Sequence, residues 1–218
     1  VTHFAACHNF YPKPYTGLAL EDIARVNLRL AALGFEIMAF VPGDANVRGP
    51  VFEGLPTVEA QRGRASKVAL NMLELAHGAD CDIVLVGDPD LSDAGWTQFA
   101  HVSAGYVDLQ CELEPGYAYV RGQIHHDRPD SSTLIFRSQE SRTTLKPDSV
   151  PMDAGAGLFR KAGSIAVSNS SYGRYEGELE IARVDLPGEE RMNVAGHITP
   201  EAMELLPFIK RGFGVRFV

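Results

Sequence analysis

The sequence predicts an α/β domain with a parallel sheet, followed by a second, mostly β domain. Apolar runs and amphipathic segments alternate three times before residue 105, which is the pattern of consecutive βαβ units. From Tyr106 onward, short runs alternate apolar and polar residues between clusters of Gly, Asn, Ser and Pro. Such runs are typical of antiparallel strands with one face in water. We therefore predict domains at residues 1–105 and 106–218.

Three apolar runs predict the strands of the first domain, at residues 4–7, 35–41 and 82–87. The run 35–41 is so apolar that we expect both of its faces to be covered. Helices are predicted at residues 20–33, 65–76 and 94–101. Their inward faces are predicted from three- and four-residue spacings as Ile23, Val26, Asn27, Leu30 and Leu33, then Val68, Ala69, Met72 and Leu75. Three units cannot close a (β/α)₈ barrel alone, because such a barrel takes about 250 residues.

The second domain is predicted as a small β-barrel or sandwich. Residues 200–209 form its one helical segment. The predicted strands are 107–113, 118–124, 133–137, 164–168, 178–184, 192–198 and 214–217.

Composition limits the classes of function. A net charge of −8 over 218 residues argues against nucleic acid or an anionic membrane as the main partner, although a local basic pocket for a phosphorylated metabolite remains compatible with it. No apolar run approaches the roughly 18 residues that span a bilayer, and no signal peptide is visible. The odd number of widely spaced cysteines predicts reduced thiols in a cytoplasmic protein. Because the sequence starts at Val1 inside a strand-like run, we expect a trimmed or incomplete chain.

Polar side chains follow each of the three predicted strands. Loops at the carboxyl ends of parallel strands are where α/β proteins place their chemistry, and a group of carboxylates with a histidine and tyrosines suits acid/base work on a sugar. We predict His8, Asn9 and Tyr11 as sugar ligands. The candidate catalytic carboxylates are Glu59, Asp88 and Glu53. The alternative is that these residues are solvated loop charges, helix caps and turn residues.

Arginines supply the candidate phosphate ligands. Arg48 lies in the long loop after the second strand and could bind a phosphate or carboxylate with both arms of its guanidinium, or form a loop salt bridge. In the second domain, Tyr172 and Arg174 lie in a turn that is either a hairpin corner or a substrate-binding lip. We expect no metal and no cofactor, because the adjacent His125 and His126 would face opposite sides of a strand.

Five stretches together resemble the MupG family, the bacterial 6-phospho-N-acetylmuramidases once called outer surface proteins. The likeness extends over essentially the whole chain. The stretches are Cys7–Pro12 with Tyr15–Leu18, Arg48–Glu59, Arg137–Ser138 with Ser141–Arg142, Tyr172–Leu179, and Asn193–Gly196.

The resemblance implies the C-terminal portion of a (β/α)₈ TIM barrel followed by a cyclophilin-like β domain. It implies metal-free hydrolysis of an N-acetylmuramic acid 6-phosphate–N-acetylglucosamine disaccharide during cell-wall recycling. The predicted strands 4–7, 35–41 and 82–87 would be the sixth to eighth of the barrel, so this chain alone is expected to be inactive. The true catalytic carboxylates could then lie on strands that the sequence does not contain.

Two other functions remain open at the level of sequence. One is a non-catalytic carbohydrate-binding or surface protein on the same fold. The other is an isomerase, by analogy with cyclophilin-like folds, although fold alone does not give function. A homodimer is one assembly that the sequence allows.

Overall fold

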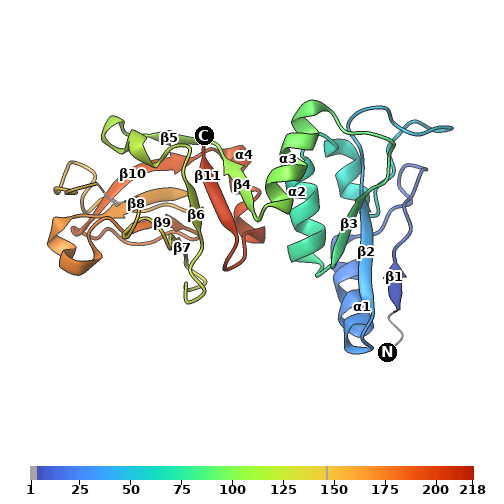
Figure 1. Cartoon of the computed structure of the whole chain (residues 1–218), viewed down its shortest axis with the longest axis horizontal. Helices are drawn as coiled ribbons and strands as arrows, with labels where there is room; N and C mark the ends of the chain where they lie inside the picture. The colour runs from blue at the N-terminus through green and yellow to red at the C-terminus, as the bar shows by residue number, and fades with distance from the viewer. Residues whose placement is uncertain (1–3, 146) are drawn as a thin grey trace. The chain divides into compact units, whose positions relative to one another are not determined.

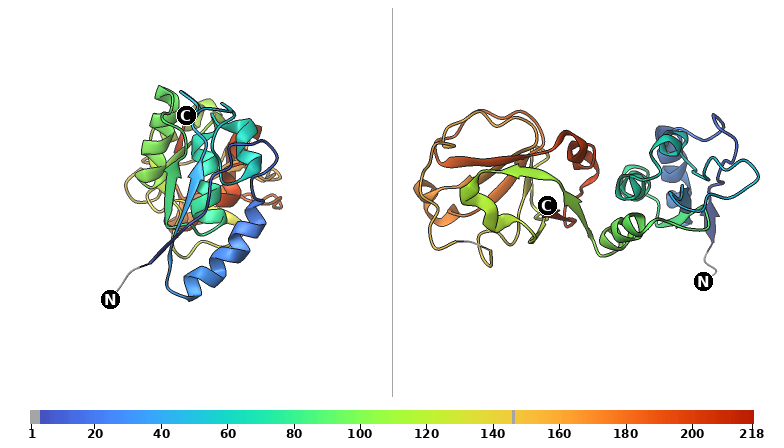
Figure 2. Two further views of the ribbon diagram at one scale, coloured as in Figure 1. Left: turned by 90° about the vertical axis from the view of Figure 1, so that its right-hand side faces the viewer. Right: turned by 90° about the horizontal axis from the view of Figure 1, so that it is seen from above.

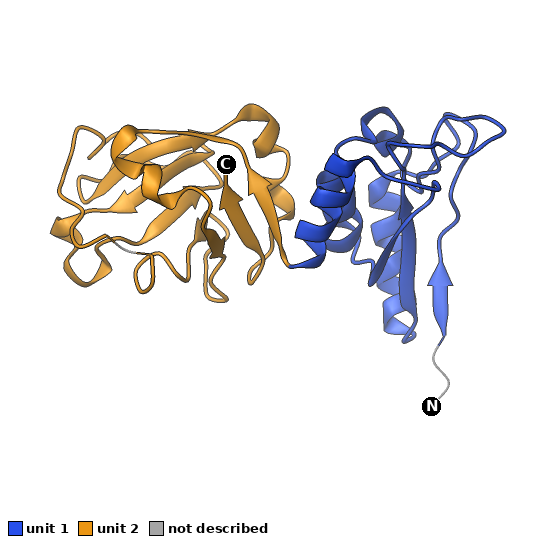
Figure 3. Ribbon diagram, turned by 45° about the horizontal axis from the view of Figure 1, so that its top comes forward, with its two compact units in different colours: residues 1–104 blue, residues 105–218 orange. Residues whose placement is uncertain are grey.

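The computed structural model of the chain describes residues 4–145 and 147–218. The chain divides into two compact units, Val1–Ala104 (unit 1) and Gly105–Val218 (unit 2), which Figure 3 colours separately. Each unit is described by itself below.

Unit 1 is built on a parallel sheet with strand order β1-β2-β3 (Figure 1). The helices gather on one side of this sheet, as the two views of Figure 2 show. A 3₁₀ helix at Glu59–Arg64 precedes α2, and a π-helical turn at Glu74–Gly78 follows it. The other elements are β1 (Ala5–Cys7), α1 (Leu20–Ala32), β2 (Glu36–Val41), α2 (Val68–Leu73), β3 (Ile83–Val86) and α3 (Asp93–Ser103).

The core of unit 1 lies between the sheet and these helices. Strand β2 contributes Ile37, Ala39 and Val41, and α2 with its π-turn contributes Val68, Met72 and Leu75. The residues of β2 between them, Met38 and Phe40, are only half-buried. Full cover on both faces of β2, expected from its apolar composition, is therefore not seen in the described part of the chain.

The buried stripe of α1 is narrower than the sequence predicts. Ile23 and Asn27 are buried and Leu30 packs against the core. Val26 and Leu33, predicted to face inward, are 45% and 74% exposed. At about 100° per residue they lie roughly 60–80° to one side of Ile23, so the sheet does not reach them.

Unit 2 contains two sheets. A five-stranded antiparallel sheet has the order β5-β10-β8-β9-β7, and a three-stranded sheet has the order β4-β11-β6 with β4 parallel to β11. Its strands are β4 (Tyr106–Leu109), β5 (Cys111–Leu113), β6 (Ile124–His126), β7 (Ile135–Arg137), β8 (Ser164–Ser168), β9 (Leu179–Ala182), β10 (Met192–Ile198) and β11 (Gly214–Phe217). The predicted helix over 200–209 is two short pieces, α4 (Pro200–Met203) and a 3₁₀ turn at Leu206–Phe208.

Two strand predictions in unit 2 need correction. The run 107–113 breaks at Gln110, where the chain passes from the three-stranded sheet to the five-stranded one. The run predicted as one strand over 118–124 instead begins in a 3₁₀ helix, Pro115–Val120, passes through a turn, and enters β6 only at Ile124. Pro115 begins this helix, and Tyr117 and Val120 are both buried because a three-residue turn aligns them.

The fold class is thus mixed α/β with several sheets, and no sheet closes into a barrel among the residues described. The barrel portion and the cyclophilin-like architecture stay predictions. No helix in residues 4–145 or 147–218 has the length and apolar character needed to cross a membrane. All three cysteines are free thiols.

Candidate functional site

The segments that follow the three strands of unit 1 are joined to one another, and we call residues 8–18, 42–58 and 87–92 the loop cluster. Thr57 is fully buried; its hydroxyl donates to the Asn9 carbonyl and accepts from the Phe40 amide, both at 2.9 Å. Leu18 pairs with Val58, which ties the first loop to the second. The polar residues predicted from the strand ends therefore stand on one hydrogen-bonded framework.

Glu59 is a fully engaged carboxylate. Its Oε1 accepts from the Tyr15 amide and from Nε of Arg62, both at 2.8 Å. Its Oε2 accepts from the Gly17 amide at 2.8 Å and from Nη2 of Arg62 at 3.0 Å. These bonds, led by the Arg62 guanidinium, lower the pKa of Glu59 to about 2. A carboxyl with that pKa is ionised at neutral pH and has no proton to give as a general acid.

Arg62, which the sequence analysis did not single out, is the hub of the loop cluster. Besides the Glu59 carboxylate, its guanidinium donates to the backbone carbonyls of Tyr11, Glu53 and Gly54 at 2.8–3.0 Å. A planar fork with five donors suits this position, where lysine could not reach every acceptor. The Glu59–Arg62 spacing of three residues is the sequence signal that could have indicated this pair.

Asp88 is buried and binds only backbone amides. Its Oδ2 accepts from Gly43 and Leu55, and its Oδ1 accepts from Arg48, all at 2.9 Å. The carboxylate therefore holds both ends and the middle of the long loop after β2 against the end of β3. In the structure, Glu59 and Asp88 organise the loops; a catalytic role for either stays a prediction.

Three predicted side chains of the cluster have polar groups with no protein partner among the described residues: the Glu53 carboxylate, the Arg48 guanidinium and the Tyr11 hydroxyl. Glu53 and Arg48 are exposed, and Tyr11 is half-buried. Their backbones are fixed, since the Glu53 and Tyr11 carbonyls accept from Arg62 and the Arg48 amide donates to Asp88. Each side chain thus extends from a fixed backbone, and its polar group is available to a ligand.

His8 has a defined orientation. Its Nε2 lies 2.7 Å from Oδ1 of the buried Asn27, whose Nδ2 donates to the Ala79 carbonyl at 2.6 Å. Because Nδ2 of Asn27 donates to the Ala79 carbonyl, the amide oxygen of Asn27 faces His8. Nε2 of His8 is therefore the donor in the bond between the two side chains. With that proton on Nε2, Nδ1 is the ring nitrogen that can accept a hydrogen bond. Neighbouring Asn9 is exposed and turns its own Oδ1 to the Phe10 amide, which leaves its Nδ2 as a donor.

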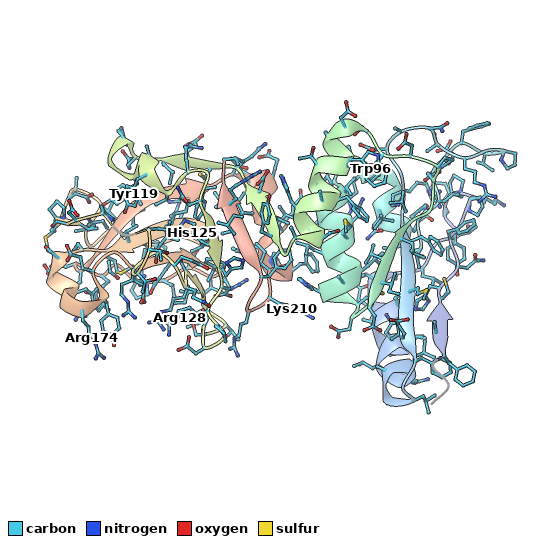
Figure 4. The ribbon with its side chains drawn as sticks, in the orientation of Figure 1. Trp96, Tyr119, His125, Arg128, Arg174 and Lys210 are labelled. Atoms are coloured by element: carbon cyan, nitrogen blue, oxygen red, sulfur yellow. The ribbon has the colours of Figure 1, made fainter. Side chains whose placement is uncertain are left out.

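Unit 2 contains a pocket of about 570 Å³ that is rich in arginine. We call it the arginine pocket; Figure 4 labels two of its residues, Arg128 and Arg174. It is lined by Arg128, Asp130, Arg137, Arg142, Arg174 and Tyr175. The sequence analysis had named Arg174 and Tyr172 here. Arg174 lines the pocket, and Tyr172 stands behind it with its ring 6.0 Å from that of Tyr175.

The segment with these tyrosines, Ser170–Tyr175, consists of two short 3₁₀ turns joined by a kink at Gly173, whose φ is 59°. Asn169 begins it by accepting from the Ser171 amide at 3.1 Å, and is itself buried. The Arg191 guanidinium lies 4.5 Å from the centre of the Tyr172 ring. The wall of the arginine pocket is therefore an ordered element.

The histidine pair of unit 2 has partners other than a metal. His125 is buried with Nδ1 2.9 Å from the Ser138 hydroxyl, and burial lowers its pKa to about 4. His126 lies 2.7 Å from the Glu140 carboxylate. Within the described ranges, no group of three or more His, Cys, Asp or Glu side chains is placed to hold a metal ion.

Comparison with known families identifies the chain in both units. Residues 1–101 match the model of the 6-phospho-N-acetylmuramidase N-terminal domain (MupG_N), and residues 107–218 match that of its C-terminal domain (MupG_C). The chain belongs to the MupG family. None of the curated proteins is similar enough to the chain to count as a match.

Two crystal structures resemble the MupG chain over 98% of its length. One is a conserved Enterococcus faecalis protein of unknown function, with 31% identity and a TM-score of 0.67; the other is an uncharacterized Bacillus cereus protein, with 26% identity and a TM-score of 0.73. The MupG chain spans 58% and 62% of their lengths, respectively.

Proposed function

We propose that the protein is a glycosidase that cleaves N-acetylmuramic acid 6-phosphate from N-acetylglucosamine, as part of peptidoglycan recycling in the bacterial cytoplasm. The observation that carries the proposal is the family match in both units, to the two domains of a 6-phospho-N-acetylmuramidase. The portion of a TIM barrel and the cyclophilin-like domain that the sequence predicts are part of this proposal.

The loop cluster is the proposed sugar-binding face. Nδ1 of His8 accepts a sugar hydroxyl, and Nδ2 of Asn9 and the Tyr11 hydroxyl supply donors. This assignment is supported by the bonds that fix each residue, while these atoms have no protein partner within residues 4–145 and 147–218. Arg48 adds a free guanidinium for an anionic substituent of the sugar.

Glu53 is the proposed catalytic carboxyl of this chain. Glycoside hydrolysis uses one carboxyl as general acid and a second as nucleophile or base, and either role needs an oxygen that can reach the substrate. Of the three predicted candidates, Glu53 alone keeps its carboxylate free of protein partners in the described structure, whereas Glu59 and Asp88 are engaged on both oxygens. We assign Glu59 and Asp88 as positioning residues that hold the loop of Glu53 and Arg48.

The test is hydrolysis of the β-linked phosphorylated disaccharide by the protein in its natural length. Glu53→Gln should lower kcat by roughly 10²–10⁴-fold, the range for loss of a general acid or base, with the melting temperature unchanged. Glu21→Gln, an exposed glutamate in the first turn of α1, is the matched control and should keep full activity. Full activity of Glu53→Gln would remove Glu53 from the mechanism.

A non-catalytic carbohydrate-binding protein is the second candidate, because two of the three predicted catalytic carboxylates are engaged in structural bonds. Binding of the disaccharide without release of N-acetylglucosamine over hours, by protein of natural length, would favour this alternative. Release of the sugar at a rate that depends on Glu53 would exclude it.

A further inference from the structure

We propose that the arginine pocket of unit 2 is a binding site for a phosphate monoester in its dianionic form. Four arginines line one pocket of a chain whose net charge is −8, so positive potential is concentrated here against the overall charge. The proposal goes beyond the proposed function, because it concerns phosphate monoesters as a class and uses contacts within unit 2 alone. As a phosphate site, it stands on its own geometry.

The charges of the pocket leave room for a dianion. Arg128 pairs with Asp130 through two bonds of 2.8 and 3.2 Å, and Arg137 pairs with the buried Glu178 through two bonds of 2.6 and 3.1 Å. Four guanidinium groups against two carboxylates leave two positive charges. A phosphate monoester at neutral pH carries nearly two negative charges and would balance them.

Arg142 and Arg174 are the arginines with donors to spare. Arg142 approaches a carboxylate only at 3.7 Å, to Glu178, which is beyond hydrogen-bond distance. Arg174 gives one bond, from Nη2 to the Tyr175 hydroxyl at 2.6 Å. Both guanidinium groups thus retain N–H pairs that can bind phosphate oxygens through two parallel bonds.

Tyr175 holds these two arginines ready for a ligand. The guanidinium carbons of Arg142 and Arg174 lie 5.4 and 4.8 Å from the centre of its ring. Arginine stacks on an aromatic face while its edge N–H groups remain free, so both side chains lose little freedom when an anion binds. The pocket is therefore organised before the ligand arrives.

The ion pairs Arg128–Asp130 and Arg137–Glu178 are expected to persist when a ligand binds. Hydrogen bonds to Glu178 and Asp130 raise the pKa values of Arg137 and Arg128, which keeps both guanidinium groups charged at any pH of interest. Glu178 has a side chain only 5% exposed, so removing Arg137 would strand a buried charge and risk the fold. The test therefore uses Arg142 and Arg174.

The experiment titrates the protein in its natural length with glucose 6-phosphate, inorganic phosphate, glucose and acetate, following binding by calorimetry. We expect glucose 6-phosphate and inorganic phosphate to bind, and glucose and acetate not to. Arg142→Lys and Arg174→Lys should each weaken phosphate binding by about tenfold, since lysine keeps the charge but loses the fork. Arg216→Lys, on β11 outside this pocket, is the matched control and should bind as the parent protein does.

Affinity should also fall as the pH drops through about 6, where the phosphate takes up its second proton, while the arginines stay charged. Equal binding by the parent, Arg142→Lys and Arg174→Lys proteins would overturn the proposal. So would loss of phosphate binding in Arg48→Lys alone, because that result places the anion at the loop cluster. If the pocket bound phosphate but the protein did not hydrolyse the disaccharide, the phosphate site would be supported and the proposed glycosidase activity would be contradicted.

Discussion

At the scale of single residues, carboxylates of the same chemistry have two different roles: some bind the backbone of the loops, and one remains available to a ligand. Glu59 and Asp88 each accept several backbone amides, which is how a loop without regular structure satisfies its donors. Glu53, nine residues before Arg62, keeps its carboxylate for solvent or ligand while its backbone carbonyl accepts from Arg62. The number of protein partners, and not the residue type, separates positioning from candidate catalytic carboxylates.

The first prediction concerns the pH dependence of stability. The pKa of Glu59 is lowered from 4.5 to about 2 on folding, so its contribution is fully present above about pH 4.5 and is lost as the pH falls toward 2. Glu59→Gln should destabilise unit 1 by roughly 1–3 kcal/mol at neutral pH and flatten the dependence on pH in that acid range. Urea unfolding followed by fluorescence of the single tryptophan, Trp96 of unit 1, measures both effects. If the free energy of unfolding of the variant fell with pH in this range as steeply as that of the parent, the stabilising role of the Glu59–Arg62 pair would be contradicted.

The second prediction separates structure from catalysis at Asp88. Asparagine offers one acceptor oxygen where three amides need acceptors, so Asp88→Asn should release part of the loop 42–58. Hydrogen exchange of the Gly43, Arg48 and Leu55 amides should accelerate by at least about tenfold. Asp93→Asn, at the start of α3, is the control and should leave these amides protected. If Asp88→Asn kept normal protection of these amides but lost the rate of disaccharide hydrolysis, Asp88 would have to be counted as a catalytic residue.

At the scale of elements, the loop cluster is packed so closely that some positions have no room for a side chain larger than that of glycine. A Cβ at Gly17 would lie 2.7 Å from Oε2 of Glu59 and 2.8 Å from its backbone nitrogen, so the first loop and the 3₁₀ helix approach as near as glycine permits. The third prediction is that Gly17→Ala lowers the stability of unit 1 by roughly 1–3 kcal/mol. Gly63→Ala, in the same 3₁₀ helix with open space around it, should be neutral or slightly stabilising. Equal thermal melts for the two variants would contradict this packing.

Elements whose periodicity is local could be predicted from the sequence. The strands 164–168, 192–198 and 214–217 agree with β8, β10 and β11 residue for residue, because turn residues define their ends. The predicted face in water is wrong for β8, which is buried at every residue, and for β10, where only His197 is exposed. The structure of the run 118–124 could not be predicted from its pattern. A strand buries every second residue and a 3₁₀ helix every third, and these two patterns cannot be told apart over so few residues.

The site was predictable only in part. Strand-end position identified Glu53, Arg48, His8, Asn9 and Tyr11 as residues of one loop cluster, but a sequence does not say which carboxylate is free. Arg62 was missed although its ion pair with Glu59 spans only three residues. Its bond to the Tyr11 carbonyl spans 51 residues and that of Asn27 to His8 spans 19, so only the fold brings these partners together. The arginine pocket draws on segments from Arg128 to Tyr175, and only the fold brings these together.

At the scale of the whole molecule, charge is distributed unevenly. A chain of net charge −8 repels anions at a distance, and it can bind a phosphorylated sugar only where guanidinium groups gather. In the part of the chain that the structure describes, the loop cluster has one guanidinium without a protein partner, Arg48, while the arginine pocket has two positive charges in excess. We therefore expect phosphate monoesters to bind at the arginine pocket more tightly than at the loop cluster.

The central claim is that this MupG-family chain serves a phosphosugar glycosidase. Its most direct test is kcat/KM of the natural-length protein for the N-acetylmuramic acid 6-phosphate–N-acetylglucosamine disaccharide, measured beside the same disaccharide without phosphate. The account predicts hydrolysis of the phosphorylated substrate with kcat/KM higher by at least about tenfold, the effect of one good charge-assisted pair. Equal rates on the two substrates, or no hydrolysis of either, would contradict it.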